Sequence, residues 1–222
     1  MYLKKHFFTP MFFITLSLLT LLTSLLVMSF KVFKNSIRIN SPVTNREFRK
    51  STVPHSYVLV STFVLPLVYY FYIYSNKRSK LDKKMQLDTN FVVIILGHFL
   101  NSFCSLSLIH CLKLIILRKR PCFDNCGKGK HQNDPWLFES FPSGHTALMF
   151  TFLPYLMFFN YKMKIKFSNQ ILVFILTFLT SVWVAFTRYL DCKHHPSDII
   201  GGVVISILVA LVDILAVLEI IN

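Results

Sequence analysis

The C-terminal stretch Ser197–Ile221, SDIIGGVVISILVALVDILAVLEII, is almost entirely apolar. A helix needs about 20 apolar residues to cross a bilayer core of roughly 30 Å, so this stretch predicts a transmembrane helix. Five apolar stretches of the same kind precede it, at about Met11–Phe30, Tyr57–Tyr74, Asn90–Leu117, His145–Phe159 and Gln170–Thr187. The sequence therefore predicts an all-α, polytopic membrane protein whose six helices form a transmembrane bundle.

Composition and charge agree with this class of protein. The chain has 222 residues, of which 54% are hydrophobic, and its mean hydropathy is +0.53. Soluble domains are usually about 45–50% apolar and lack such runs. The net charge of +14 comes from Lys and Arg beside the apolar segments, which indicates contact with bilayer headgroups rather than nucleic acid binding. Residues 1–222 are predicted to form one multi-pass integral membrane domain, with a retained signal anchor at the N-terminus.

The order of the predicted spans places the main polar motifs on one side of the membrane. With a cytosolic N-terminus, residues 31–56, 118–144 and 188–196 all lie on the luminal or extracellular face. Counts of Lys and Arg in the loops do not decide between the two orientations. The basic segment 31–56 has two open interpretations, a stretch along the lipid surface or an ordinary polar loop.

Three polar motifs lie within residues 113–198. They are Lys113-Leu-Ile-Ile-Leu-Arg-Lys-Arg120-Pro121, Pro142-Ser143-Gly144-His145 and Arg188-Tyr-Leu-Asp-Cys-Lys-His194-His195-Pro-Ser-Asp198. Lys113, Arg120 and Arg188 would bind a phosphate dianion if their helix ends meet, since Arg presents a planar fork to phosphate oxygens and Lys a point charge. Ser143 and Gly144 open a predicted helix, where backbone N–H groups attract an anion and Gly allows close approach. The motifs thus predict a phosphate site.

Two histidines and an acid in these motifs fit the cleavage of a phosphate ester. A neutral imidazole attacks phosphorus when its second nitrogen is held by a carboxylate, and His194 precedes Asp198 by four residues at the expected start of a helix. His145 is then the acid for the leaving alkoxide. The three cations would stabilise the transition state without a metal ion, and the sequence has no carboxylate cluster suited to Mg²⁺.

These motifs resemble the signature of the type 2 phosphatidic acid phosphatase superfamily, which includes lipid phosphate phosphatases and vanadium haloperoxidases. The signature is Lys-x6-Arg-Pro, Pro-Ser-Gly-His and Ser-Arg-x5-His-x3-Asp; every spacing matches, and Thr187 stands where the family usually has Ser. The resemblance implies a Mg²⁺-independent phosphatase that forms a phosphohistidine at His194, assisted by Asp198, with His145 as the acid. It implies that phosphate is bound by Lys113, Arg120, Ser143, Gly144 and Arg188.

Within the superfamily, the chain is similar to eukaryotic lipid phosphate phosphatases. Arg120-Pro121-x-Phe123-x-x-Cys126 and Lys193-His194-His195 carry this likeness, although Cys122 replaces their usual Asp. The likeness implies a membrane-embedded lipid phosphate as substrate, with phosphatidate converted to diacylglycerol and phosphate. An isoprenoid pyrophosphate or sphingoid-phosphate phosphatase would use the same residues, and a catalytically inactive lipid-binding protein is a further alternative.

Other polar residues near the motifs have structural interpretations. Arg118 and Lys119 are expected to snorkel to the membrane surface, and His195 to form a pocket wall or a helix cap. If the loops are luminal, a disulfide among three cysteines is plausible: Cys122, Cys126 and Cys192. Deeper in the bundle, His98 and Asp213 are each 15 residues from a motif, or about 22 Å along a helix. They are expected to pair, or to share a polar neighbour such as Asn101, for structural reasons.

Overall fold

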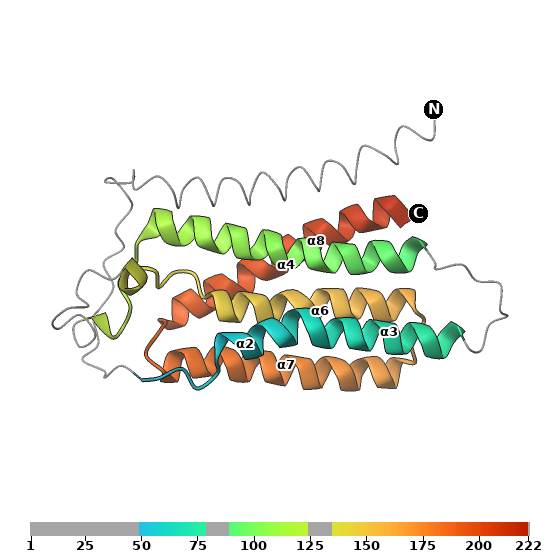
Figure 1. The fold of residues 1–222 in the computed structure, drawn as a ribbon, viewed down its shortest axis with the longest axis horizontal. Coiled ribbons are helices and arrows are strands. Elements are labelled where there is room, and N and C mark those ends of the chain that lie inside the picture. The colour runs from blue at the N-terminus through green and yellow to red at the C-terminus, as the bar shows by residue number, and fades with distance from the viewer. Residues whose placement is uncertain (1–48, 79–88, 124–134, 222) are drawn as a thin grey trace, which may run out of the picture.

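The structure, a computed structural model, describes residues 49–78, 89–123 and 135–221, and these residues form a bundle of long helices (Figure 1). The first long helix is continuous through three parts: α2 (His55–Leu59), the π-helical turn η1 (Val60–Val64) and α3 (Leu65–Arg78). It is followed by α4 (Thr89–Ile116), the short 3₁₀ helix η2 (Pro135–Phe138), α6 (Gly144–Lys162), α7 (Phe167–Leu190) and α8 (Pro196–Ile221). The described residues contain no strand, so the all-α prediction is confirmed for them.

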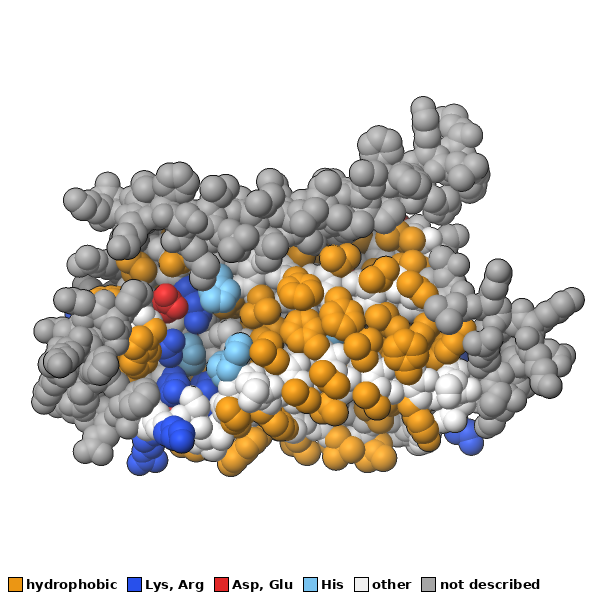
Figure 2. All heavy atoms as spheres, in the orientation of Figure 1, with side chains coloured by type: hydrophobic (Ala, Val, Ile, Leu, Met, Phe, Trp, Pro, Cys, Tyr) orange, Lys and Arg blue, Asp and Glu red, His pale blue; other side chains and the backbone are white. Residues whose placement is uncertain are grey.

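Four helical segments are long and apolar enough to cross a membrane. They are His55–Lys77, Asn90–Ile116, Phe167–Leu190 and Pro196–Ile221. Their outward faces expose large apolar side chains such as Trp183 and Leu208, and Figure 2 shows apolar side chains spread over the middle of the bundle. An apolar surface of this extent requires lipid around it, so the chain is an integral membrane protein. The first predicted span, Met11–Phe30, lies outside the described residues, and the count of six helices stays a prediction.

Helix α6 lies inside the bundle, packed against α4, α7 and α8. It corresponds to the predicted fourth span, and it is less apolar than the other spans because its neighbours shield it from lipid. Its polar side chains find partners there. Thr151 Oγ1 donates to Ser105 Oγ over 3.3 Å, and Tyr69 donates its hydroxyl to Asn160 Oδ1 over 2.7 Å. These bonds across the bundle hold α6 to α4 and α3.

His98 is fully buried in α4, and its imidazole bonds to the first helix rather than to Asp213. Pro66 has no N–H to donate to the carbonyl oxygen of Thr62, four residues before it. His98 Nε2 lies 2.8 Å from that oxygen and takes the place of the missing donor. The predicted pairing of His98 with Asp213 is therefore not found; His98 satisfies a backbone group that Pro66 leaves without a partner.

Asp213 lies at the interface of α8 with α4 and α6, beside Gly97. A Cβ on Gly97 would lie 2.7 Å from Val217 Cγ2, 2.8 Å from the Tyr155 hydroxyl and 3.4 Å from Asp213 Oδ2. Gly97 therefore allows α8 to pack closely against α4. Within the part of the chain that the structure describes, neither Asp213 Oδ2 nor the Tyr155 hydroxyl has a hydrogen-bond partner.

Candidate active site

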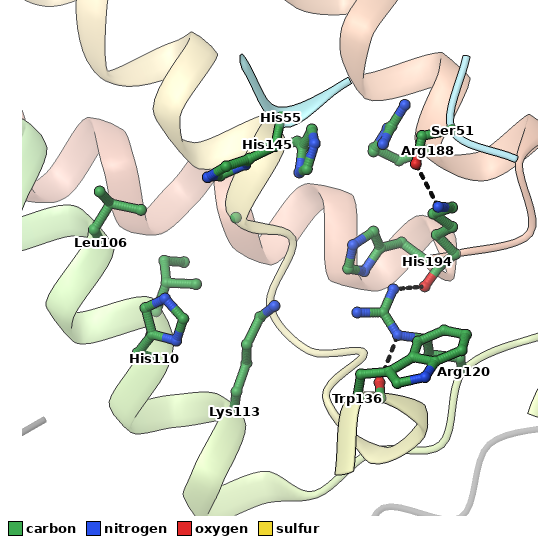
Figure 3. A pocket seen from close by; sticks show the side chains of 13 residues that line it. Ser51, His55, Leu106, His110, Lys113, Arg120, Trp136, His145, Arg188 and His194 are labelled. Atoms are coloured by element: carbon green, nitrogen blue, oxygen red, sulfur yellow. Dashed lines mark hydrogen bonds between the residues drawn. The ribbon is translucent and has the colours of Figure 1, made fainter. Parts of the chain in front are cut away.

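The three motifs meet at one end of the bundle, where Figure 2 shows Lys, Arg and His side chains gathered beside the apolar band. A cavity of about 270 Å³ lies there between the ends of several helices (Figure 3). Six of the eight predicted site residues line this cavity: Lys113, Arg120, Gly144, His145, Arg188 and His194. The other two, Ser143 and Asp198, lie behind its wall. The structure thus brings together residues that are up to 85 positions apart in the sequence.

Lys113 is in the last turn of α4 and reaches into the cavity. The helix ends just after it because Leu117 adopts a left-handed conformation (φ 38°) and donates its N–H to the Lys113 carbonyl over 3.2 Å. In Figure 3 the Lys113 side chain extends from α4 toward Arg120 and His194 on the opposite wall. Within the described residues, its ammonium group has no hydrogen bond to another side chain or carbonyl, so it can bind an anion.

Arg120 is buried and held in one orientation by backbone carbonyls. Its Nε donates to the Trp136 oxygen over 2.7 Å, one Nη to the Lys193 oxygen over 2.9 Å and the other to the Glu139 oxygen over 3.3 Å. The guanidinium also lies 5.1 Å from the centre of the Trp136 ring. Each Nη carries a second N–H, so Arg120 keeps two donors for a phosphate.

Arg188 lies in the last turn of α7, and only 1% of its surface is exposed. One Nη donates to Asp191 Oδ2 over 2.9 Å and to the Val53 carbonyl over 3.1 Å. The chain then turns at Cys192 (φ 54°), so that the N–H groups of both Lys193 and His194 point back to the Arg188 carbonyl, at 3.1 and 3.3 Å. This turn brings the backbone of His194 back to the end of α7, next to Arg188.

His194 is 4% exposed and has one ring nitrogen engaged. Its Nδ1 lies 2.6 Å from the Ser140 carbonyl oxygen, an arrangement that requires Nδ1 to carry the proton. Burial lowers the pKa of His194 to about 3; Arg120 and Lys113 act in the same direction, and Asp198 in the opposite one. At neutral pH the imidazole is therefore uncharged, with the lone pair on Nε2, which is the state that a nucleophile requires.

Asp198 is positioned by the start of α8. Pro196 occupies the first helical position, where its missing N–H costs nothing. Asp198 Oδ2 accepts the N–H of His195 over 2.8 Å, as the third residue of a capping box does. The Asp198 carbonyl accepts the N–H of Ser143 over 2.9 Å, which ties the second motif to the third. The Ser143 amide is therefore engaged here, and the Ser143 side chain is fully buried.

The Asp198 carboxylate faces His194 without a direct hydrogen bond. Asp198 Oδ2 lies 3.8 Å from His194 Nδ1, and it accepts the Ser140 hydroxyl over 2.5 Å. Its other oxygen forms an ion pair with Arg118. Ser140 therefore connects the two motif residues, with its hydroxyl on Asp198 and its carbonyl on His194.

His145 is in the first turn of α6, on the cavity wall. Its ring lies 5.2 Å from the ring of His55, which belongs to the start of α2. A Cβ on the neighbouring Gly144 would meet only Ile109 Cγ2, at 3.7 Å. Packing therefore does not require glycine at this position, whereas close approach of a ligand to the backbone would.

Two predictions for residues near the motifs are wrong. Arg118 does not snorkel to the surface: its side chain is only 11% exposed and pairs with Asp198. Lys119 is exposed, as predicted, and its ammonium lies over the Phe123 ring at 4.4 Å. Cys122 and Cys192 are both buried and free, so the plausible disulfide does not join them; Cys126 lies outside the described residues.

His195 turns away from the cavity. Its Nε2 lies 3.1 Å from the Lys119 carbonyl, and its ring is nearly buried. Burial lowers its pKa, while the Lys119 carbonyl and Asp198 raise it. His195 thus joins the loop after α4 to the start of α8, in agreement with the predicted structural role.

Several residues of the site carry no signal in the sequence. They include Ser51 before α2, His55 at the start of α2, His110 on α4, Arg118, Ser140 and Asp191. A single polar residue at a helix end or in a loop has the same appearance whether it is solvated or part of a site. Among these residues, Arg118 and Asp191 fall inside the motifs, where a charged residue between the motif positions could have drawn attention.

Comparison with known proteins decides the family. A family model described as the PAP2 superfamily matches residues 91–220, more than half of the chain. The chain belongs to the PAP2 superfamily. The PAP2 region contains all three motifs and every predicted site residue, and membership supports a phosphatase that acts on phosphate esters. No curated protein and no solved structure matches the chain.

Proposed function

We propose that this PAP2 protein is a lipid phosphate phosphatase that hydrolyses phosphatidate or a related lipid phosphate through a phosphohistidine on His194. One observation carries the proposal: an uncharged, buried imidazole shares a cavity with three cations at the end of a membrane bundle. A cavity of this composition favours a dianionic ligand, and its place on the bundle favours a lipid.

Binding of the phosphate would use the cations from three sides of the cavity. Lys113 contributes a point charge from α4, while Arg120 and Arg188 contribute paired N–H donors from positions that carbonyls and a carboxylate already hold. Little side-chain entropy is then lost on binding, because the two arginines are ordered beforehand. The N–H groups at the start of α6, from Gly144 onward, can complete the anion site.

The first chemical step would be attack of His194 Nε2 on phosphorus. A P–N bond forms as the bond from phosphorus to the lipid oxygen breaks, and His145, which takes up a proton when the phosphate dianion binds beside it, donates that proton to the leaving alkoxide. The negative charge on the equatorial oxygens is stabilised by the three cations. The lipid alcohol leaves, and His194 carries the phosphoryl group.

The second step would be hydrolysis of the phosphohistidine. Neutral His145 takes a proton from a water molecule, whose oxygen attacks phosphorus as the P–N bond breaks. His194 returns to its uncharged state with Nδ1–H on the Ser140 carbonyl, and inorganic phosphate is released. Asp198 assists in both steps by stabilising the positive charge that develops on His194, from 3.8 Å and through Ser140. The protein's own cations supply the charge, so we propose that no metal ion is needed.

The location of the site supports a substrate that stays in the membrane. The cavity lies beside the apolar band of the bundle, so a phosphate headgroup can reach it while the hydrocarbon remains in lipid. We place the site on the luminal or extracellular face, because the alternation of the predicted spans puts the motifs opposite a cytosolic N-terminus.

An isoprenoid pyrophosphate or a sphingoid phosphate would use the same residues. The cavity wall also includes His55, His110 and Lys193, which are more polar groups than a single phosphate requires. These additional donors favour the pyrophosphate among the alternatives.

The test is release of inorganic phosphate from phosphatidate in detergent micelles with EDTA present, for the wild type and for His194→Ala. We expect metal-independent release that the variant lacks, and an acid-labile phosphoryl label on the wild type alone. Pyrophosphate and sphingoid substrates are assayed in parallel, and activity on only one of them would change the substrate while keeping the mechanism. A wild type that is inert on all of them would favour a lipid-binding protein without catalysis.

A further inference from the structure

The segment Ser51–His55, which we call the strap, leads into α2 and lies across the phosphate site. It precedes the PAP2 region, which begins at residue 91, and in the sequence it is only the end of a basic loop. In the structure, Ser51 and His55 line the cavity (Figure 3). Residues outside the family motifs thus form one wall of the site.

Thr52 of the strap binds the carboxylate of Asp191 with two donors. Its backbone N–H donates to Oδ2 over 2.9 Å, and its hydroxyl donates to Oδ1 over 2.6 Å. Both carboxylate oxygens are therefore fixed by one residue that is 139 positions away in the sequence. Asp191 is 2% exposed, so water can hardly replace these donors.

Asp191 in turn holds the guanidinium of Arg188. Its Oδ2 accepts one Nη over 2.9 Å, and the carbonyl of Val53, the next strap residue, accepts the same Nη over 3.1 Å. The strap therefore holds Arg188 twice, directly through Val53 and indirectly through Thr52 and Asp191. Within the described residues the other Nη makes no hydrogen bond, so both of its N–H groups remain for phosphate.

Two more contacts join the strap to the site. The ammonium of Lys193 donates to the Ser51 hydroxyl, and the ring of His55 lies 5.2 Å from that of the proposed acid, His145. The strap thus contacts three kinds of group: two cations, the proposed acid, and the carboxylate that holds Arg188. A segment that only covered the protein would not be expected to meet all three.

We infer that the strap positions the phosphate-binding groups, and that Thr52 is a positioning residue that sets the direction of the Arg188 guanidinium through Asp191. This inference rests on the proposed phosphate site but not on the identity of the lipid. An unrestrained arginine loses rotamer entropy when a ligand orders it, and this loss costs free energy. Because the strap and Asp191 order Arg188 beforehand, phosphate binding need not supply that free energy.

The test compares Thr52→Val, which removes the hydroxyl at nearly constant shape, with Thr52→Ser, which keeps it. The matched control is Thr180→Val on α7, away from the phosphate site, where among the described residues the hydroxyl bonds to its own helix at the Leu176 carbonyl. The measurements are the inhibition constants of inorganic phosphate and vanadate, kcat and KM, and the melting temperature in detergent.

We expect Thr52→Val to weaken vanadate and phosphate inhibition and to lower kcat/KM, each about tenfold, as for a hydrogen bond to a charged group. Thr52→Ser and Thr180→Val should stay near the wild type in activity and in melting temperature, whereas Thr52→Val should melt at a lower temperature, because one buried oxygen of Asp191 loses its donor. Wild-type inhibition constants in Thr52→Val would overturn the inference. If Thr52→Val proves unstable, Asp191→Asn takes its place, because it keeps the shape of the side chain but removes the negative charge that faces Arg188, and the same loss of anion inhibition is expected.

The anion measurements also separate this inference from the proposed function. Binding of phosphate or vanadate can also be measured as the rise in melting temperature that these anions cause, and this measurement requires no turnover. A wild type that binds these anions without hydrolysing any lipid would refute the phosphatase, while the effect of Thr52→Val on anion binding would still test the strap. A wild type that binds neither anion would refute both.

Discussion

Arg118 and Asp198 form a buried ion pair between the loop after α4 and the first turn of α8. Arg118 also donates to the Ser197 hydroxyl over 2.7 Å, and Asp198 accepts the Ser140 hydroxyl on its other oxygen. The carboxylate beside the proposed nucleophile is thus shared between a cation and a hydroxyl, and its orientation depends on both. Arg118, which occupies a position that the motif leaves unspecified, therefore belongs to the site.

Substitution of Arg118 should impair catalysis more than folding. We expect Arg118→Gln to lower kcat about 10- to 100-fold, because Asp198 would lose its charged partner and turn away from His194. Lys119→Gln is the control, since this neighbouring cation is exposed and should tolerate the change. Steady-state kinetics on phosphatidate would show the difference, and equal rates for the two variants would contradict the role given to Arg118.

The pH dependence of stability should report the buried state of His194. Its pKa falls from an ordinary value of 6.5 to about 3 in the fold. Between these two pH values His194 binds a proton in the unfolded chain but not in the folded site. The contribution of neutral His194 to the free energy of unfolding is therefore complete above pH 6.5 and is lost as the pH falls. Melting temperatures should therefore drop less for His194→Asn than for the wild type between pH 7 and pH 4.5. Parallel curves would show that His194 does not titrate in this way.

Substitution of Gly202 should lower stability, whereas substitution of Gly144 should lower activity. A Cβ on Gly202 would lie 2.6 Å from the Ser143 carbonyl oxygen, whereas a Cβ on Gly144 would meet nothing closer than 3.7 Å. We expect Gly202→Ala to cost about 1–3 kcal/mol of stability, since backbone must shift. Gly144→Ala should keep the melting temperature and lower the activity, because its methyl group would narrow the phosphate site. Equal melting temperatures for the two variants would contradict the packing argument.

Removal of the charge at Asp213 should raise stability. This carboxylate is buried between helices, and within the described residues its Oδ2 has no hydrogen-bond partner. A buried charge without a partner is costly in a membrane bundle, so Asp213→Asn should melt at a higher temperature than the wild type at pH 9, where the carboxyl group is ionised. Glu219→Gln, at an exposed position of the same helix, should leave the melting temperature unchanged. A lower value for Asp213→Asn would mean that the carboxylate has a ligand.

Residues far apart in the sequence explain why some predictions were wrong. His98 was expected to meet Asp213, because both are ionisable and lie at the same depth. The structure pairs His98 with the Thr62 carbonyl, which Pro66 leaves without a donor. Arg118 was expected to snorkel like other cations at helix ends, and its partner Asp198 is 80 positions away. Neither partner can be identified from spacing, since each contact depends on which helices are neighbours.

The class of protein follows from the sequence alone, and the sequence also singles out the residues that we propose for the site. Apolar runs of membrane length require helices, because backbone groups must bond within the segment in lipid, and the motif spacings identify His194, His145 and three cations as candidates. How these groups are held depends on the tertiary structure. Ser140 lies between His194 and Asp198, Arg118 neutralises Asp198, and Thr52 fixes Asp191. These supports come from loops without periodicity, so their positions follow from the packing of the helices and cannot be derived from the local sequence.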